Sequence, residues 1–138
     1  MTVEERMDLK AYFEEKNGRG ILATADSEGK VDLAVYGKPH FMEDGTIALI
    51  MADRLTHHNL QSNDHAAYMF MEEGAGYKGI RLFLTKINEE QDSDRLYAMR
   101  SKKYPSKKEE GKIRFLVFFT IDKQLPLIGA EREDDTLT

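Results

Sequence analysis

The first hydrophobic positions of the chain repeat with the period of a helix. Thr2 and Glu5 have the spacing of a capping box, and apolar residues then recur every third or fourth position. Asn17 and Gly18 interrupt this pattern, and residues of these types commonly end a helix. We therefore predict an N-terminal helix between Thr2 and Asn17.

After Gly20 the hydrophobic period changes to that of strands. An apolar run over residues 21–24 is followed by turn residues at 26–29 and by alternation over 31–36, a pattern typical of a β-hairpin. Pro39 is expected to end strand pairing or to lie on a sheet edge. Residues 47–51 form a further predicted strand, apolar on both faces.

The rest of the chain alternates strands with two helices. Asp53 is expected to cap a short helix over residues 54–61. The other predicted elements are strands over 66–71, 80–84 and 113–119 and a helix over 92–103. This order gives about six strands and three helices. Short antiparallel strands joined by tight turns favour a mainly β fold, a small closed barrel with peripheral helices.

Composition narrows the class of protein. With 138 residues, 41% hydrophobic, the chain is expected to form one domain over residues 1–130, followed by a disordered acidic tail over 131–138. The net charge of -5 argues against nucleic acid or an anionic membrane as partner, and the absence of cysteine excludes thiolate chemistry. No leader and no run of about 20 apolar residues occurs, so we expect a soluble cytoplasmic protein.

Residues 74–79 match the dinucleotide-binding pattern G-x-G-x-x-G. In that fingerprint the glycines open a helix whose N-terminus meets a pyrophosphate, whereas here they lead into the predicted strand 80–84. We therefore reject a dinucleotide fold and interpret the segment as a loop, in which Tyr77 and Lys78 remain available to line a ligand.

The start of the helix over 54–61 carries the more informative chemistry. A cation in the first helical turn opposes the helix dipole, so Arg54 lies where the helix itself favours an anion. Its guanidinium, the Thr56 hydroxyl and the free backbone N–H groups are all suited to hold one phosphate. The alternative is that Asp53 caps the helix, Arg54 is solvated and nothing binds.

Four histidines, His40, His57, His58 and His65, raise the question of a metal site. The adjacent His57 and His58 point about 100° apart on a helix, and no H-E-x-x-H pattern is present. No serine occupies a G-x-S-x-G elbow either. We expect no metal, and the sequence identifies no catalytic residue.

Over residues 5–129 the chain resembles the FMN-binding split barrels related to pyridoxamine 5'-phosphate oxidase, in particular the short single-domain members. The resemblance rests on the helix leading into residues 20–24, the Asp-Gly turn before 47–51, the segment 54–63, and the later stretches 79–82 and 125–129. Asp64 stands where the family often has proline. The C-terminal arginine signature of the true oxidases is also missing, so the resemblance does not extend to vitamin B6 oxidation.

The resemblance implies a six-stranded antiparallel split β-barrel and assigns site residues. Arg54, Leu55 and Thr56 would hold the FMN phosphate, with Asn59 beside them in the same helix. The flavin ring would run along Val35, Tyr36 and Gly37, with Ile50 and Met51 beneath it. The family is usually a homodimer with FMN at the subunit interface, and we expect the same here.

These points lead to an FMN-binding flavoprotein as the expected function, an FMN-dependent oxidoreductase with a small-molecule redox partner. Because FMN supplies the redox chemistry, such a protein requires no catalytic triad. The alternative on the same barrel is a haem-binding protein or a flavin carrier without turnover. A third interpretation is an interaction domain without a cofactor.

Overall fold

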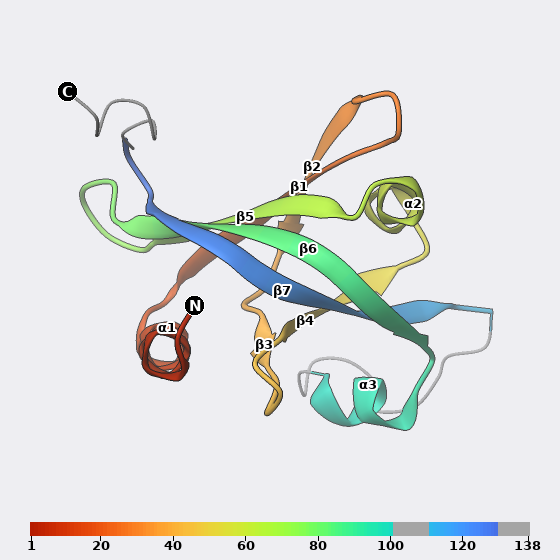
Figure 1. Ribbon diagram of the computed structural model, residues 1–138, viewed down its shortest axis with the longest axis horizontal. Coiled ribbons are helices and arrows are strands. Elements are labelled where there is room, and N and C mark those ends of the chain that lie inside the picture. Colours follow the sequence, from red (N-terminus) through yellow and green to blue (C-terminus); the bar gives the residue numbers. More distant parts are fainter. Residues whose placement is uncertain (101–110, 130–138) are drawn as a thin grey trace.

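The structure is a computed structural model, and it describes residues 1–100 and 111–129. Its elements are arranged around a single sheet (Figure 1). In chain order they are α1 (Val3–Glu15), β1 (Gly18–Ala25), β2 (Val31–Tyr36), β3 (His40–Phe41), β4 (Ile47–Ala52), α2 (Leu55–Ser62), β5 (His65–Glu72), β6 (Gly79–Gln91), α3 (Asp94–Met99) and β7 (Arg114–Pro126).

The sheet curls into a half-barrel with the helices at its periphery (Figure 1). Its strand order is β2-β1-β5-β6-β7-β4-β3, and every pairing is antiparallel. Within the described residues no ladder joins the two edge strands, β2 and β3, so the barrel is open between them. The mainly β fold with peripheral helices is confirmed.

The expected number of strands and their closure are wrong. The sheet has seven strands, because the short strand β3 follows Pro39 directly and pairs with β4 at Ala48 and Ile47. Two residues are too few to show an alternating pattern. The short link over 37–39 then leaves β2 and β3 as separate edges of one open sheet.

Several predicted boundaries also differ. Strands β6 and β7 are each 13 residues long, because they pair with each other far beyond their alternating stretches and absorb two register shifts. Helix α3 spans only Asp94–Met99, with Ser93 as its N-cap. Residues 101–103 of the predicted helix, and the predicted acidic tail over 131–138, lie outside the described residues. No helix in the described ranges has the length and apolar character needed to cross a membrane.

The N-terminal helix forms as predicted, and it packs on the sheet. The Thr2 hydroxyl accepts a hydrogen bond from the Glu5 amide at 3.0 Å, which confirms the cap. Leu9 and Phe13 are the buried residues of α1, and the Phe13 ring meets Phe70 of β5 at 5.1 Å between centroids. Helix α1 therefore covers the core at one end of the half-barrel (Figure 1).

Candidate functional site

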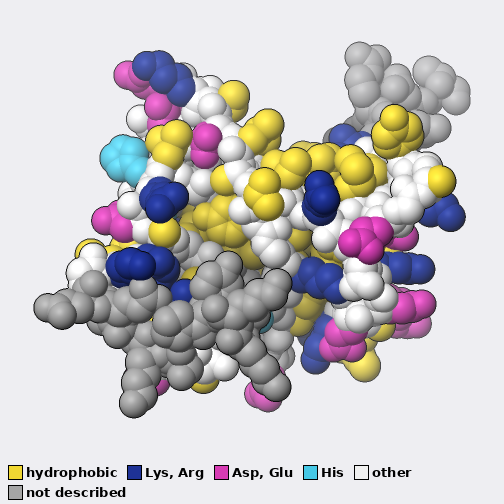
Figure 2. All heavy atoms as spheres, turned by 180° about the vertical axis from the view of Figure 1, so that it is seen from behind, with side chains coloured by type: hydrophobic (Ala, Val, Ile, Leu, Met, Phe, Trp, Pro, Cys, Tyr) yellow, Lys and Arg dark blue, Asp and Glu magenta, His cyan; other side chains and the backbone are white. Residues whose placement is uncertain are grey.

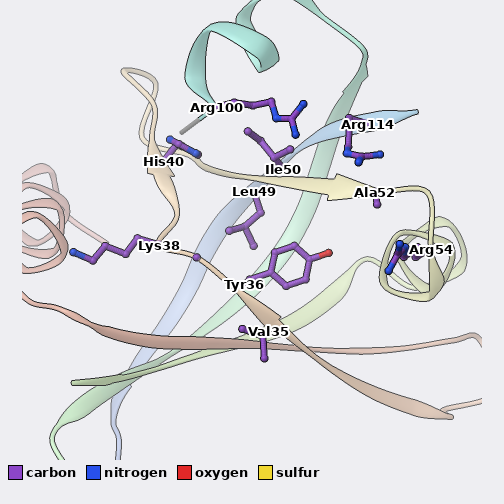
Figure 3. Close-up of a pocket in the computed structure, with 11 residues that line it drawn as sticks. Val35, Tyr36, Lys38, His40, Leu49, Ile50, Ala52, Arg54, Arg100 and Arg114 are labelled. Carbon is purple, nitrogen blue, oxygen red and sulfur yellow. The ribbon is translucent and has the colours of Figure 1, made fainter. Parts of the chain in front are cut away.

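A cavity of about 580 Å³ lies between β2 and β4, where the barrel is open (Figure 3). Its volume is within the range of about 300–1,000 Å³ typical of small-molecule sites. The residues that line it come from β2, the link between β2 and β3, β3, β4, β7 and the ends of α2 and α3. They are Val35, Tyr36, Gly37, Lys38, His40, Leu49, Ile50, Ala52, Arg54, Arg100 and Arg114.

The charge of this lining is positive. Lys38, Arg54, Arg100 and Arg114 contribute cations, and none of the described lining residues is a carboxylate. Arg114 lies at the same end of the cavity as Arg54, because the β4–β7 ladder pairs Arg114 with Ala52 (Figure 3). Burial lowers the pKa of His40 below its usual value of 6.5, so its imidazole is neutral at pH 7. The cavity is therefore suited to a ligand with an anionic group.

Helix α2 begins at the edge of this cavity without a side-chain cap. Its N-cap is Arg54, in extended conformation, so the predicted cap at Asp53 is wrong. The chain turns one residue later than the pattern indicated, because the Arg54 carbonyl accepts the first helical hydrogen bond, from His58 at 2.9 Å. The first-turn N–H groups are left without a capping side chain, an arrangement that favours a bound anion.

A smaller cavity of about 320 Å³ adjoins the first at the start of α2. It shares Val35, Tyr36, Ala52 and Arg54 with the main cavity and adds Asp32, Leu33, Ala34, Leu55 and Thr56. The two cavities together therefore run from the β2–β3 link to the first turn of α2.

Polar groups in the smaller cavity fix the side chains around Arg54. The Thr56 hydroxyl donates to an Asp32 carboxylate oxygen at 3.3 Å. Burial and the Asp32 carboxylate raise the pKa of Tyr36, against the opposing effect of its hydrogen bond with Thr56. The Asp32 carboxylate repels an anion in this cavity. An anion at this end must therefore be held by Arg54 and the N–H groups of the first α2 turn.

The structure brings together seven of the nine predicted cofactor residues. Val35, Tyr36, Gly37, Ile50 and Arg54 line the main cavity, and Leu55 and Thr56 line the smaller one.

Met51 and Asn59 lie elsewhere. Met51 is 1% exposed within the core, and the Asn59 amide donates to Thr24 at 3.1 Å in the interior. Within the described part of the chain neither lines either cavity, so any part that they take in the site is indirect.

Sequence reasoning missed several lining residues. Lys38 and His40 flank Pro39 directly after the predicted stretch 35–37, so extending that stretch would have included them. Arg100 and Arg114 come from the end of α3 and the start of β7, and only the tertiary fold brings them to β4. Among the described residues, no group of three His, Asp or Glu side chains is arranged to hold a metal ion.

A partly buried polar cluster around His57 anchors α2 to the sheet. The His57 ring stacks on Phe115 of β7 at 3.6 Å between centroids, and its Nε2 lies 2.9 Å from a Glu89 carboxylate oxygen on β6. The other Glu89 oxygen accepts from Lys86 at 2.7 Å and from Gln61 at 2.9 Å. The first turn of α2 is thus held against two strands.

This cluster predicts an acid-sensitive stability. Burial acts to raise the pKa of Glu89, but hydrogen bonds from Lys86, Gln61 and His57 outweigh it and lower the pKa from 4.5 to about 2. A carboxyl whose pKa is lower in the folded state stabilises the fold above pH 4.5, and this stabilisation is lost as the pH falls towards 2. Urea unfolding at a series of pH values should show this loss, and Glu89→Gln should reduce it. An unchanged acid slope in the variant would contradict the assignment.

Comparison with known proteins establishes the fold class. No family model and no curated protein matches the chain. Solved structures do match. An FMN-binding protein from Syntrophomonas wolfei is 22% identical with a TM-score of 0.69, covering 93% of this chain and 90% of that one. A putative pyridoxamine 5'-phosphate oxidase from Lactobacillus delbrueckii is 16% identical with a TM-score of 0.62, covering 91% and 93%. The haem storage protein HutZ from Vibrio cholerae is 16% identical with a TM-score of 0.65, covering 91% and 95%.

At these identities the matches bear on the fold. They confirm the resemblance at that level: the chain has the split-barrel fold of FMN-binding and pyridoxamine 5'-phosphate oxidase-like proteins.

Proposed function

We propose that this chain is an FMN-binding flavoprotein that holds its cofactor between β2 and β4. The observation that carries the proposal is the uncapped start of α2 at Arg54, at one end of a cavity that apolar side chains of β2 and β4 also line. An anionic group and a flat apolar ring are the two parts of FMN, and the cavity offers a matching environment for each.

The residues present are suited to both parts of the cofactor. Arg54 and the free N–H groups of the first α2 turn would hold the phosphate, with the Thr56 hydroxyl beside them once it turns from Asp32. Val35 and Ile50 would contact the ring, with the link at Gly37 along its edge. FMN accepts and donates electrons through its ring, so the protein itself binds, orients and tunes it. We infer an oxidoreductase that acts on a small-molecule redox partner.

We also propose a homodimer, with a second copy covering β2. Val31, Leu33 and Val35 are 82%, 71% and 82% exposed and lie on one face of this edge strand. In the view from behind, hydrophobic side chains gather across the upper middle of the molecule (Figure 2). Val35 also lines the cavity, so an interface on this face is continuous with the proposed cofactor site.

Leu33→Lys should shift this dimer towards monomer at micromolar concentration, because it places a charge in the middle of the apolar face. Light scattering of the FMN-loaded protein measures the mass. Val3→Lys is the control, since Val3 is also exposed, at 62%, but lies on α1. A wild-type monomer, or equal effects of the two substitutions, would contradict the proposed interface.

The absorption spectrum of the purified protein tests the cofactor. Flavin bands, or their retention after loading with FMN and gel filtration, support the proposal. A haem Soret band alone would instead indicate the haem-binding alternative, and a blank spectrum after loading would contradict a flavin site. Turnover of a reduced nicotinamide by the loaded protein then separates an oxidoreductase from a carrier.

A further inference from the structure

A buried tyrosine reaches the wall of the cavity from two strands away. Tyr68 of β5 is 1% exposed, and its hydroxyl donates to the Gly37 carbonyl oxygen at 2.9 Å. The intervening strand β1 has a glycine at the crossing point. A Cβ on Gly20 would lie 2.1 Å from the Tyr68 hydroxyl oxygen, so the phenol fills the space that a side chain would occupy.

This hydrogen bond fixes the direction of one peptide group. The described residues contain no cis peptide bond, so the Gly37 carbonyl and the Lys38 N–H lie on opposite sides of the same planar unit. Because the carbonyl is turned inward to Tyr68, the N–H is turned away from the core. Gly37 and Lys38 both line the main cavity, and a Cβ on Gly37 would meet no atom within 4 Å.

The Lys38 N–H has no acceptor within the part of the chain that the structure describes. An unpaired backbone N–H at a cavity wall is a donor held ready for a ligand. Burial raises the pKa of Tyr68 above its usual value of 10.0, so its hydroxyl remains a donor throughout the neutral range. The arrangement therefore persists under the conditions in which a ligand would bind.

We propose that Tyr68 is a positioning residue for the cofactor: through the Gly37 carbonyl it aims the Lys38 N–H at an acceptor atom on the ring edge of the bound flavin. This inference rests on the proposed function and goes beyond it, because it makes a residue outside the cavity responsible for the orientation of the peptide group that contacts the ring. Arg54 then recognises the phosphate of the cofactor, and the Gly37–Lys38 peptide group recognises the edge of its ring.

Tyr68→Phe tests the inference, because it removes the hydroxyl and keeps the ring in the core. We expect it to weaken FMN and riboflavin by the same factor, about 3- to 10-fold, since the lost contact is to the ring that both share. Tyr12→Phe is the matched control. It removes a phenol hydroxyl that donates to Glu72 at 2.6 Å, away from the cavity lining, and should leave both affinities unchanged.

Amide hydrogen exchange gives a readout that a merely structural role would not move. In the wild-type protein riboflavin should slow exchange at the Lys38 amide by about tenfold, and in Tyr68→Phe this protection should be largely lost. Unchanged affinities in Tyr68→Phe, or unchanged protection of the Lys38 amide, would overturn the inference while leaving the proposed function intact. A wild-type protein that binds neither flavin would overturn both.

Discussion

Arg54→Ala is expected to weaken FMN by about 1.5–3 kcal/mol, because it removes a charge-assisted hydrogen bond to the phosphate. This corresponds to a dissociation constant roughly 10- to 150-fold higher. Arg54 is the N-cap of α2, so its loss also leaves the uncapped first turn without the cation beside it. Thr56→Ala removes a neutral hydroxyl and should cost less, about 0.5–1.5 kcal/mol.

Riboflavin provides the internal control for Arg54→Ala, because it lacks the phosphate and should bind the variant almost as it binds the wild-type protein. Arg81→Ala is the matched variant. Arg81 donates to the Pro126 and Gly129 carbonyls, each at 2.9 Å, and does not line the main cavity. Equal weakening of FMN and riboflavin by Arg54→Ala would assign Arg54 to the fold. If neither ligand weakens, the phosphate lies elsewhere, and Lys38 and Arg114 are the next residues to test.

Gly20→Ala is expected to lower the free energy of unfolding by about 3 kcal/mol or more, at the upper end of the cost of overpacking. Its new Cβ would lie 2.1 Å from the Tyr68 hydroxyl oxygen and 2.5 Å from the Tyr36 backbone oxygen. A flexible side-chain end can move aside, but a backbone oxygen within the β1–β2 ladder can do so only by disturbing the strand pairing.

Gly37→Ala makes the same chemical change beside the cavity and should alter stability by about 0.5 kcal/mol or less, because its Cβ meets open space. Urea unfolding of the two variants at one pH measures the difference. A Gly20→Ala protein as stable as Gly37→Ala would show that β1 has room for a side chain. The Tyr68 side chain would then not cross β1 at Gly20.

The parts of the fold that were predictable have local signals. The capping box at Thr2 and the alternation in β2 each depend on residues close together in sequence, and each signal led to the right element. The closure of the barrel has no local signal. Whether β2 meets β3 depends on the register of the whole sheet, and register is set by long-range pairing.

In the candidate site, the position of single side chains also depends on tertiary structure that the local sequence does not reveal. Strand β4 is apolar on both faces, so its sequence does not reveal that Ile50 faces the cavity while Met51 faces the core. In α2, the helical rotation carries Asn59 away from Arg54 to a hydrogen bond with Thr24. Arg114 reaches the cavity only because β7 pairs with β4.

A calorimetric titration of the wild-type protein with FMN, and in parallel with riboflavin, tests whether the cavity binds a flavin and recognises its phosphate. We expect one FMN per chain, bound at least about tenfold more tightly than riboflavin, because the Arg54 end of the cavity recognises the phosphate. Equal affinities for the two ligands, or no binding of either, would contradict it.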